Sequence, residues 1–144
     1  MIADLPKHLA VAHGIHIVPG LKQASPPDVM RGEETQLFAL DESIGAVCFP
    51  GTHTKHVTVE HGRIIGFTTE ITGELRALLT ANGGLQTPQD VQQEFSEAVF
   101  REWVEYSLDP DDAASPFAVR AARMTGLLDP KHHEAALTGL LIGA

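Results

Sequence analysis

The sequence predicts an α/β fold in which an antiparallel strand meander is followed by helices. Between residues 46 and 69, apolar residues form a continuous run or alternate with polar residues, which is typical of strands. After residue 72 they recur every three or four positions, which is typical of amphipathic helices. The chain has 144 residues and 43% hydrophobic content, enough for one compact core. Strands first and helices afterwards indicate one lobe of a larger α/β protein.

The first forty residues predict a strand, a loop and a helix. Residues 15–18 are mainly β-branched and stop at a Pro-Gly pair, as a strand ended by a turn would. A double proline predicts a loop over residues 22–29. Two glutamates then precede an apolar segment, and carboxylates in a first turn favour the positive end of a helix dipole. We therefore expect a helix over residues 32–42.

The middle of the chain predicts three antiparallel strands. Residues 46–49 are continuously apolar, as in a buried strand, and a Pro-Gly pair ends them. Residues 55–59 alternate apolar and polar side chains, a turn follows at residues 60–62, and residues 63–69 resume the apolar pattern. Cys48, the single cysteine, lies in the first strand and is expected to pack as a small core residue in a reducing compartment.

The second half of the chain predicts four helices. Thr72-Gly73-Glu74 resembles a capping sequence, so the first helix should begin near Leu75. The apolar residues that predict the second helix recur every four positions: Val91, Phe95, Val99 and Trp103. A loop over residues 108–115 should then precede helices over residues 117–128 and 133–142.

Composition excludes several classes of partner. A formal net charge of −9 repels phosphate backbones, and no cluster of Lys or Arg offsets it, which argues against nucleic acid. Aromatic residues make up only 6% of the chain, so stacking platforms are scarce. No window approaches the roughly 20 apolar residues of a membrane span, and no leader segment is evident. We expect a cytoplasmic protein without a membrane partner, which recognises small molecules mainly through polar groups.

The turn between the first two strands of the meander could bind an anion. It reads Pro50-Gly51-Thr52-His53-Thr54-Lys55. Glycine lets the backbone approach a phosphate closely, the two threonines can donate hydrogen bonds, and the lysine supplies a point charge. On spacing alone, the simpler explanation is an ordinary hairpin turn with solvated polar side chains.

The start of the helix predicted over residues 32–42 places an arginine beside two carboxylates. A carboxylate at a helix start can accept the proton of an attacking hydroxyl, which makes Glu33 and Glu34 candidate bases. Arg31 could hold a substrate carboxylate through two hydrogen bonds. The alternative is purely structural, with the glutamates capping the helix and Arg31 as their ion partner.

The eight histidines raise the question of a metal site. His53 and His56 are three residues apart, but that spacing gathers ligands on one face only in a helix, and here it crosses a turn into a strand. No HExxH pattern or second cysteine supports a site. We therefore expect no metal ligands from the protein, and a zinc protein using His53, His56 and His61 is the least favoured alternative.

Six blocks of the sequence occur in the same order as the motifs of the 2-dehydro-3-deoxygalactonokinases. The resemblance to this family covers most of the present chain. The most specific are residues 31–36, Arg-Gly-Glu-Glu-Thr-Gln, and residues 50–53, Pro-Gly-Thr-His. The others lie at residues 18–21, 62–65, 72–75 and 137–143.

The resemblance implies a partial lobe of an actin-like, ribonuclease-H-like kinase of roughly twice this length. Residues 1–30 would be the end of the N-terminal lobe and its connection, and residues 31–144 the core of the C-terminal lobe without its adenosine-binding end. Such kinases transfer the γ-phosphate of ATP, with Mg²⁺, to the 6-hydroxyl of 2-dehydro-3-deoxygalactonate in galactonate degradation.

The resemblance also implies roles for particular residues. Carried over by position, Glu33 would be the catalytic base with Glu34 as the reserve candidate, and Arg31 and Glu74 would contact the sugar acid. The residues of the second phosphate-binding turn would be Gly51, Thr52, His53 and Lys55.

Two alternatives remain for the chain as it stands. As a fragment it could be a catalytically inactive relic of a kinase that serves as a ligand-binding module. It could also serve as a dimerisation module, since a homodimer is compatible with either function.

Overall fold

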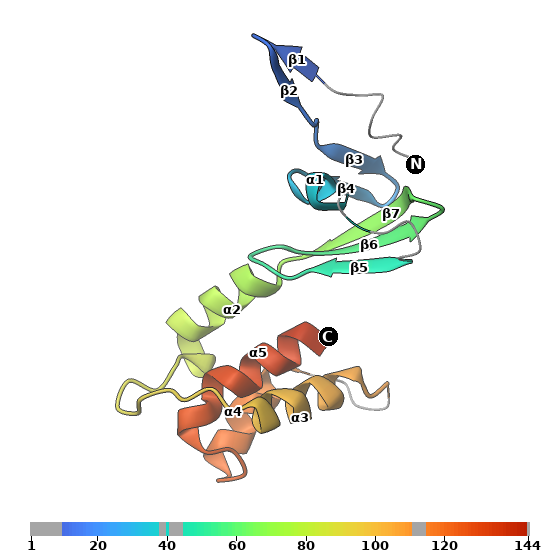
Figure 1. Ribbon diagram of the computed structural model, residues 1–144. Helices are drawn as coiled ribbons and strands as arrows, with labels where there is room; N and C mark the ends of the chain where they lie inside the picture. The colour runs from blue at the N-terminus through green and yellow to red at the C-terminus, as the bar shows by residue number, and fades with distance from the viewer. Residues whose placement is uncertain (1–9, 38–39, 41–44, 111–114, 144) are drawn as a thin grey trace. The chain divides into compact units, whose positions relative to one another are not determined.

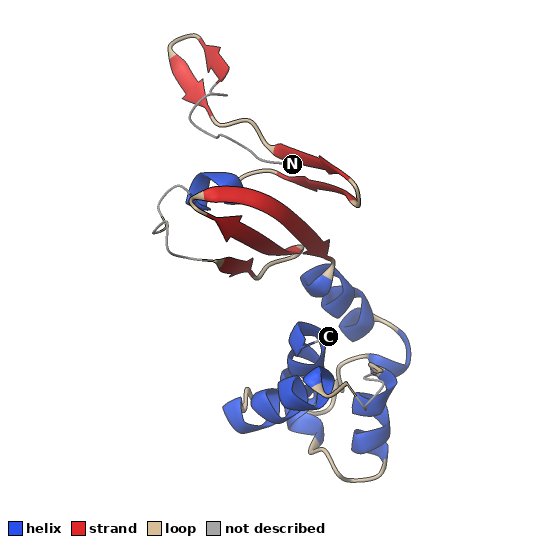
Figure 2. Ribbon diagram, turned by 90° about the vertical axis from the view of Figure 1, so that its right-hand side faces the viewer, coloured by secondary structure: helices blue, strands red, loops and turns tan. Residues whose placement is uncertain are grey.

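The computed structural model describes residues 10–37, 40, 45–110 and 115–143. The chain divides into two compact units, Met1–Ile71 and Thr72–Ala144. Each unit has its own hydrophobic core, whereas composition alone predicted one. Among the described residues the strands all belong to the first unit, and the helices α2 to α5 belong to the second (Figures 1 and 2). The predicted order of antiparallel strands followed by helices is therefore confirmed.

The first unit contains two hairpins, a short helix and a three-stranded sheet. Its elements are β1 (Ala10–Ala12), β2 (Ile15–Ile17), β3 (Leu21–Ala24), β4 (Pro27–Met30), α1 (Glu33–Leu37), β5 (Ala46–Phe49), β6 (Thr54–Glu60) and β7 (Arg63–Glu70). β1 pairs with β2 and β3 with β4, both antiparallel, and the sheet has the order β5-β6-β7. Residues 38–39 and 41–42, in the second half of the helix predicted over residues 32–42, lie outside the described residues.

The loop predicted over residues 22–29 is wrong, because these residues form the β3–β4 hairpin. Proline weakens a strand prediction, yet Pro27 is the first residue of β4, a position where proline is tolerated. Side chains attach the hairpin to β7. Gln23 accepts a hydrogen bond from the Phe67 amide and donates one to the Phe67 carbonyl, both at 3.2 Å. The Thr69 amide donates to Asp28 Oδ2 at 2.7 Å.

The sheet confirms the predicted meander but exposes one face of β5. Val47 and Phe49 are half-buried while Cys48, between them, is exposed, so the prediction of a core cysteine is wrong. Successive side chains in a strand point to opposite faces, and a continuous apolar run does not reveal that one face meets solvent. The core of this unit consists of Met30, Val57, Ile64 and Phe67.

The second unit is helical. Its elements are α2 (Thr72–Ala81), η2 (Gly83–Leu85), α3 (Glu97–Leu108), α4 (Phe117–Met124), η3 (Pro130–His132) and α5 (His133–Gly143). The prediction of helix over residues 91–95 is wrong, since α3 begins only at Glu97. Ser96 caps it by accepting a hydrogen bond from the Val99 amide. The four-residue spacing of apolar residues therefore begins before the helix itself does.

Helices α3 and α5 pack unusually closely in this unit. A Cβ added to Gly139 would overlap the Phe100 carbonyl oxygen, and one added to Gly143 would lie 2.6 Å from the Val104 carbonyl oxygen. Two glycines four residues apart therefore give α5 a flat surface on which α3 rests. None of the helices in the described ranges combines the length and hydropathy needed to cross a bilayer.

Candidate functional site

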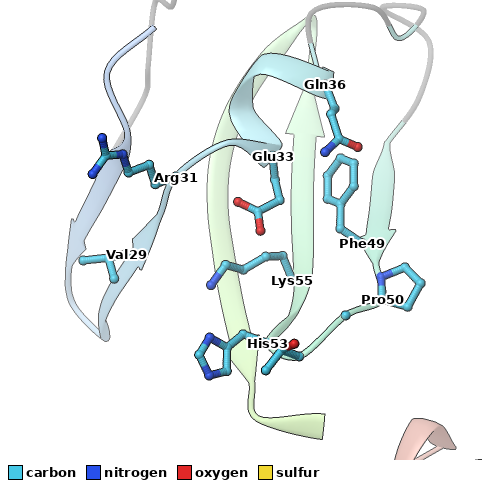
Figure 3. Close-up of a pocket in the computed structure, with 10 residues that line it drawn as sticks. Val29, Arg31, Glu33, Gln36, Phe49, Pro50, His53 and Lys55 are labelled. Carbon is cyan, nitrogen blue, oxygen red and sulfur yellow. The ribbon is translucent and has the colours of Figure 1, made fainter. Parts of the chain in front are cut away.

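A pocket of about 580 Å³ lies within the first unit, between α1 and the start of β6 (Figure 3). The residues that line it come from β4, the connection to α1, α1 itself, β5, the turn before β6 and the start of β6: Val29, Arg31, Glu33, Gln36, Phe49, Pro50, Gly51, Thr52, His53 and Lys55. Six of the eight residues singled out from the sequence are among them. The structure thus brings together the two segments that the sequence marked separately.

Lys55 is a buried cation at the wall of this pocket. Its side chain is on β6, in register with Thr69 of β7 and Phe49 of β5, and the residue is only 6% exposed. Its ammonium donates a hydrogen bond to Thr69 Oγ1 at 2.8 Å. Burying an ammonium is unfavourable unless hydrogen bonds or opposite charge compensate, and the bond to Thr69 supplies part of that compensation.

Asp28 supplies the negative charge behind Thr69. Thr69 donates to it twice, from its hydroxyl to Oδ1 at 2.6 Å and from its amide to Oδ2 at 2.7 Å. Burial by itself would raise the pKa of Asp28, but the hydrogen bonds from Thr69 and Val29 and the charge of Lys55 outweigh it. The pKa therefore lies below its ordinary value of 3.8, and the carboxylate is ionised at neutral pH.

Glu33 and Glu34 differ sharply although they are adjacent in α1. Glu34 is 1% exposed, and its Oε2 accepts a hydrogen bond from the Gly32 amide at 2.7 Å. Gly32 has φ +117°, which L side chains rarely adopt, so this bond closes a turn that needs glycine. Glu33 lines the pocket instead, and its Oε2 is screened from solvent without a hydrogen-bond partner. Buried carboxylate oxygens are normally satisfied, so this oxygen is a strong candidate for contact with a ligand.

The remaining predicted residues occupy distinct places. Glu33, Lys55 and His53 follow one another along the pocket, while the Arg31 guanidinium points away from the first two (Figure 3). Thr52 lines the pocket and is exposed. Glu74 lies in the first turn of α2, in the second unit.

The turn itself is closed by a threonine. Thr54 is 7% exposed and its hydroxyl accepts a long hydrogen bond, 3.5 Å, from the Gly51 amide. The expectation that both threonines face a ligand therefore fits Thr52, which lines the pocket, while Thr54 holds the turn. The histidines do not converge, because the part of the chain described here contains no group of three His, Cys, Asp or Glu that could hold a metal ion.

Sequence reasoning missed Asp28 and Thr69, which support the pocket from behind. Both lie in or next to segments marked by the sequence, but their partnership spans 41 residues and depends on the hairpin that the double proline concealed. Phe49 and Gln36 also went unrecognised as lining residues. The alternation of β5 could have placed Phe49 on the same face as Lys55, since antiparallel partners share a face.

The arrangement combines donors for an anion with an unsatisfied carboxylate. Lys55 and the Thr52 hydroxyl can approach phosphate oxygens, and Glu33 can accept a proton from a hydroxyl placed beside them. An anion bound by this turn would therefore lie in the pocket.

Comparisons with known proteins give matches to one family. The family described as 2-keto-3-deoxy-galactonokinase matches residues 2–144. The 2-dehydro-3-deoxygalactonokinase of Escherichia coli (strain K12) is 39% identical over 141 residues, covering 94% of this chain and 48% of that protein. A protein named probable 2-dehydro-3-deoxygalactonokinase from Rhizobium meliloti (strain 1021) is 36% identical over 143 residues, covering 92% and 47%.

A solved structure shows the same fold. It is a crystal structure of a candidate 2-dehydro-3-deoxygalactonokinase from Sinorhizobium meliloti, with a TM-score of 0.77 and 35% identity over 89% of this chain and 46% of that one. The chain thus spans about half the length of the curated relatives it matches. Since the family match extends over residues 2–144, this chain belongs to the 2-keto-3-deoxy-galactonokinase family.

Proposed function

We propose that this chain carries the phosphate-binding and acceptor-activating part of a 2-dehydro-3-deoxygalactonokinase. The observation that supports it best is the pairing, in one pocket, of the buried Lys55 ammonium with a Glu33 oxygen that has no hydrogen-bond partner. A pocket that binds only an anion has no need of the carboxylate. A kinase needs both, because an acceptor hydroxyl must lose a proton next to a polyphosphate.

In the proposed reaction, Glu33 accepts the proton of the 6-hydroxyl of 2-dehydro-3-deoxygalactonate. The hydroxyl oxygen forms a bond to the γ-phosphorus of ATP as the bond from that phosphorus to the β,γ-bridging oxygen breaks, which releases ADP. Lys55 and the Thr52 hydroxyl stabilise the charge on the phosphoryl oxygens, and the Gly51 amide can join them by giving up its long bond to Thr54. His53 lines the same turn and would contact the nucleotide phosphates.

Glu33 is proposed as the base in preference to Glu34. The Glu34 carboxylate is buried against the Gly32 amide and does not line the pocket. Its role would be to hold the turn that presents Glu33. Arg31 and Glu74 would bind the sugar acid, with the arginine turning toward the substrate carboxylate when it arrives.

The pocket fits phosphate better than it fits a metal ion. The described lining residues supply hydrogen-bond donors and one carboxylate, Glu33. Mg²⁺ is usually held by one or two carboxylates together with substrate phosphates and water, so it would enter with the ATP phosphates and neutralise their charge there.

We propose that the protein lies in the cytoplasm. We also propose that residues 1–30 are the end of the N-terminal lobe and its connection, and that residues 31–144 belong to the C-terminal lobe.

The test uses the chain alone and a chimera in which residues 2–144 replace the matching segment of the Escherichia coli relative. ADP release is measured with ATP, Mg²⁺ and 2-dehydro-3-deoxygalactonate. Glu33→Gln should lower kcat by about 10²- to 10⁴-fold, the usual contribution of a general base. Glu34→Gln serves as the matched control. Compared with Glu33→Gln, it should lower the free energy of unfolding more and kcat less. Full activity of Glu33→Gln would refute the assignment.

A second candidate is a non-catalytic relic that serves as a ligand-binding or dimerisation module. It predicts that the chain alone binds ATP or the sugar acid without turnover, or that it forms a homodimer. Isothermal titration and sedimentation velocity on the isolated chain distinguish these outcomes. Turnover by the isolated chain that Glu33→Gln abolishes would eliminate the relic.

A further inference from the structure

The Lys55 ammonium is held by a chain of hydrogen bonds that ends at Asp28. Lys55 Nζ donates to Thr69 Oγ1 at 2.8 Å, and the same hydroxyl donates its only hydrogen to Asp28 Oδ1 at 2.6 Å. Because that hydrogen is committed to Asp28, the lone pairs of Thr69 Oγ1 are left to accept from the ammonium. The direction of the chain is therefore fixed by the carboxylate at its end.

Asp28 is itself fixed from three sides. Its Oδ2 accepts from the Thr69 amide at 2.7 Å, and its Oδ1 also accepts from the Val29 amide at 2.7 Å. Both backbone donors are rigid, so the carboxylate cannot swing toward the lysine and neutralise it directly. An ammonium bonded through a neutral hydroxyl keeps its remaining hydrogens available for another acceptor.

The pocket gives that acceptor a place. Lys55 and Glu33 both line it, and Glu33 Oε2 has no hydrogen-bond partner. A lysine has a flexible four-carbon stem and is easily misplaced, so a cation that must meet a phosphate needs an anchor behind it. Thr69 and Asp28 provide that anchor from outside the pocket.

We propose that Asp28 is a positioning residue that, through the Thr69 hydroxyl, holds the Lys55 ammonium in place for a polyphosphate. This inference rests on the proposed function, in which Lys55 contacts the nucleotide phosphates. Neither Asp28 nor Thr69 touches the ligand, so their effect is on phosphate affinity through the geometry of Lys55.

The experiment uses the full chain and tripolyphosphate as the probe. Binding is measured by isothermal titration, and the Lys55 ammonium is followed by ¹⁵N NMR of the lysine side chains, with the exposed Lys22 as internal reference. Thr69→Val and Asp28→Asn should each weaken tripolyphosphate binding about tenfold, the usual effect of losing one hydrogen bond to a charged group. Both should also broaden the Lys55 ammonium signal, because its protons then exchange faster with water.

Two further variants separate positioning from a purely structural role. Thr69→Ser keeps the hydroxyl and should retain both binding and the NMR signal. Thr68→Val makes the same change as Thr69→Val at the exposed neighbour on the opposite face of β7, and it should leave both readouts unchanged.

The outcomes distinguish this inference from the proposed function. If Thr69→Val and Asp28→Asn change neither the ammonium signal nor the affinity, the positioning role is refuted. If Lys55→Met leaves tripolyphosphate binding unchanged, the phosphate role of Lys55 is refuted instead. In that case the ammonium signal in Asp28→Asn still decides whether Asp28 positions Lys55. A loss of signal and affinity that Thr69→Ser does not share supports both.

Discussion

Replacing Gly139 with alanine should destabilise the second unit. The new Cβ would overlap the Phe100 carbonyl oxygen and lie 3.1 Å from Trp103 Cβ. The overlapped atom belongs to the backbone of α3, so no side-chain rotation can relieve the contact. The two helices must separate, which opens gaps around Leu137 and Leu140, residues of the core that are 0% and 1% exposed.

Two opposing terms set the magnitude. Alanine is favoured over glycine inside a helix by about 1 kcal/mol. Overpacking a close contact costs about 1–3 kcal/mol, and a backbone neighbour places Gly139 toward the upper end of that range. The net effect should be a loss of about 1–2 kcal/mol in the free energy of unfolding.

Urea unfolding followed by circular dichroism measures this change. The matched control is Gly45→Ala in the first unit, where an added Cβ meets nothing within 4 Å. That variant should stay within about 0.5 kcal/mol of wild type, as surface substitutions usually do. If Gly139→Ala unfolds at the same urea concentration as wild type or a higher one, the close packing of α3 on α5 is refuted.

Three further predictions concern charged groups. The folded pKa of Asp28 lies below 3.8, so its ionised form stabilises the fold fully above that pH. In urea unfolding, the stability difference between wild type and Asp28→Asn should therefore shrink as the pH falls below 3.8. A difference that stays constant would contradict this. Burial, aided by the charge of Arg123, lowers the pKa of His133 below 6.5, so below that pH the unfolded chain binds a proton that the folded chain does not. The free energy of unfolding should therefore fall as the pH drops below 6.5. An imidazole that becomes charged at pH 6.5 in an NMR titration of the folded protein would refute this prediction. Arg76 pairs with Glu134 at 2.6 Å and also donates to Thr138, so Arg76→Met should lower the free energy of unfolding in urea by about 1 kcal/mol. The control Arg101→Met removes an exposed ion pair and should cost no more than about 0.5 kcal/mol. Equal losses in the two variants would contradict the prediction.

Local patterns predicted the elements whose signals are complete within a few residues. The three-stranded meander follows from alternation and from turns at a Pro-Gly pair and at residues 60–62, all of which are local properties. Helix α5 follows likewise, with bounds within one residue of those expected. The start of α3 was missed although Ser96 followed by Glu97 is a capping signal, because the apolar spacing received more weight than the cap.

Long-range partnerships could not be predicted in the same way. The β3–β4 hairpin is not evident from its own residues, because the partners of Gln23 and Asp28 lie on β7, more than forty residues away. The same limit applies to the candidate site. Sequence reasoning named residues on both walls of the pocket and ranked Glu33 ahead of Glu34 only through the family resemblance. The physical difference between the two glutamates lies in their burial and hydrogen-bond partners, which local sequence does not give.

The contacts that protect the edge of the sheet also build the pocket. The Gln23 amide pairs with both backbone groups of Phe67, as a neighbouring strand would, and Asp28 occupies the Thr69 amide two residues further along the same edge. An exposed strand edge invites pairing with other chains, so these side chains have a structural purpose of their own. Yet β4 leads directly into Gly32 and Glu33, and Thr69 holds Lys55. Docking the hairpin on β7 therefore fixes the carboxylate and the ammonium relative to each other, which neither the sheet nor the hairpin could do alone.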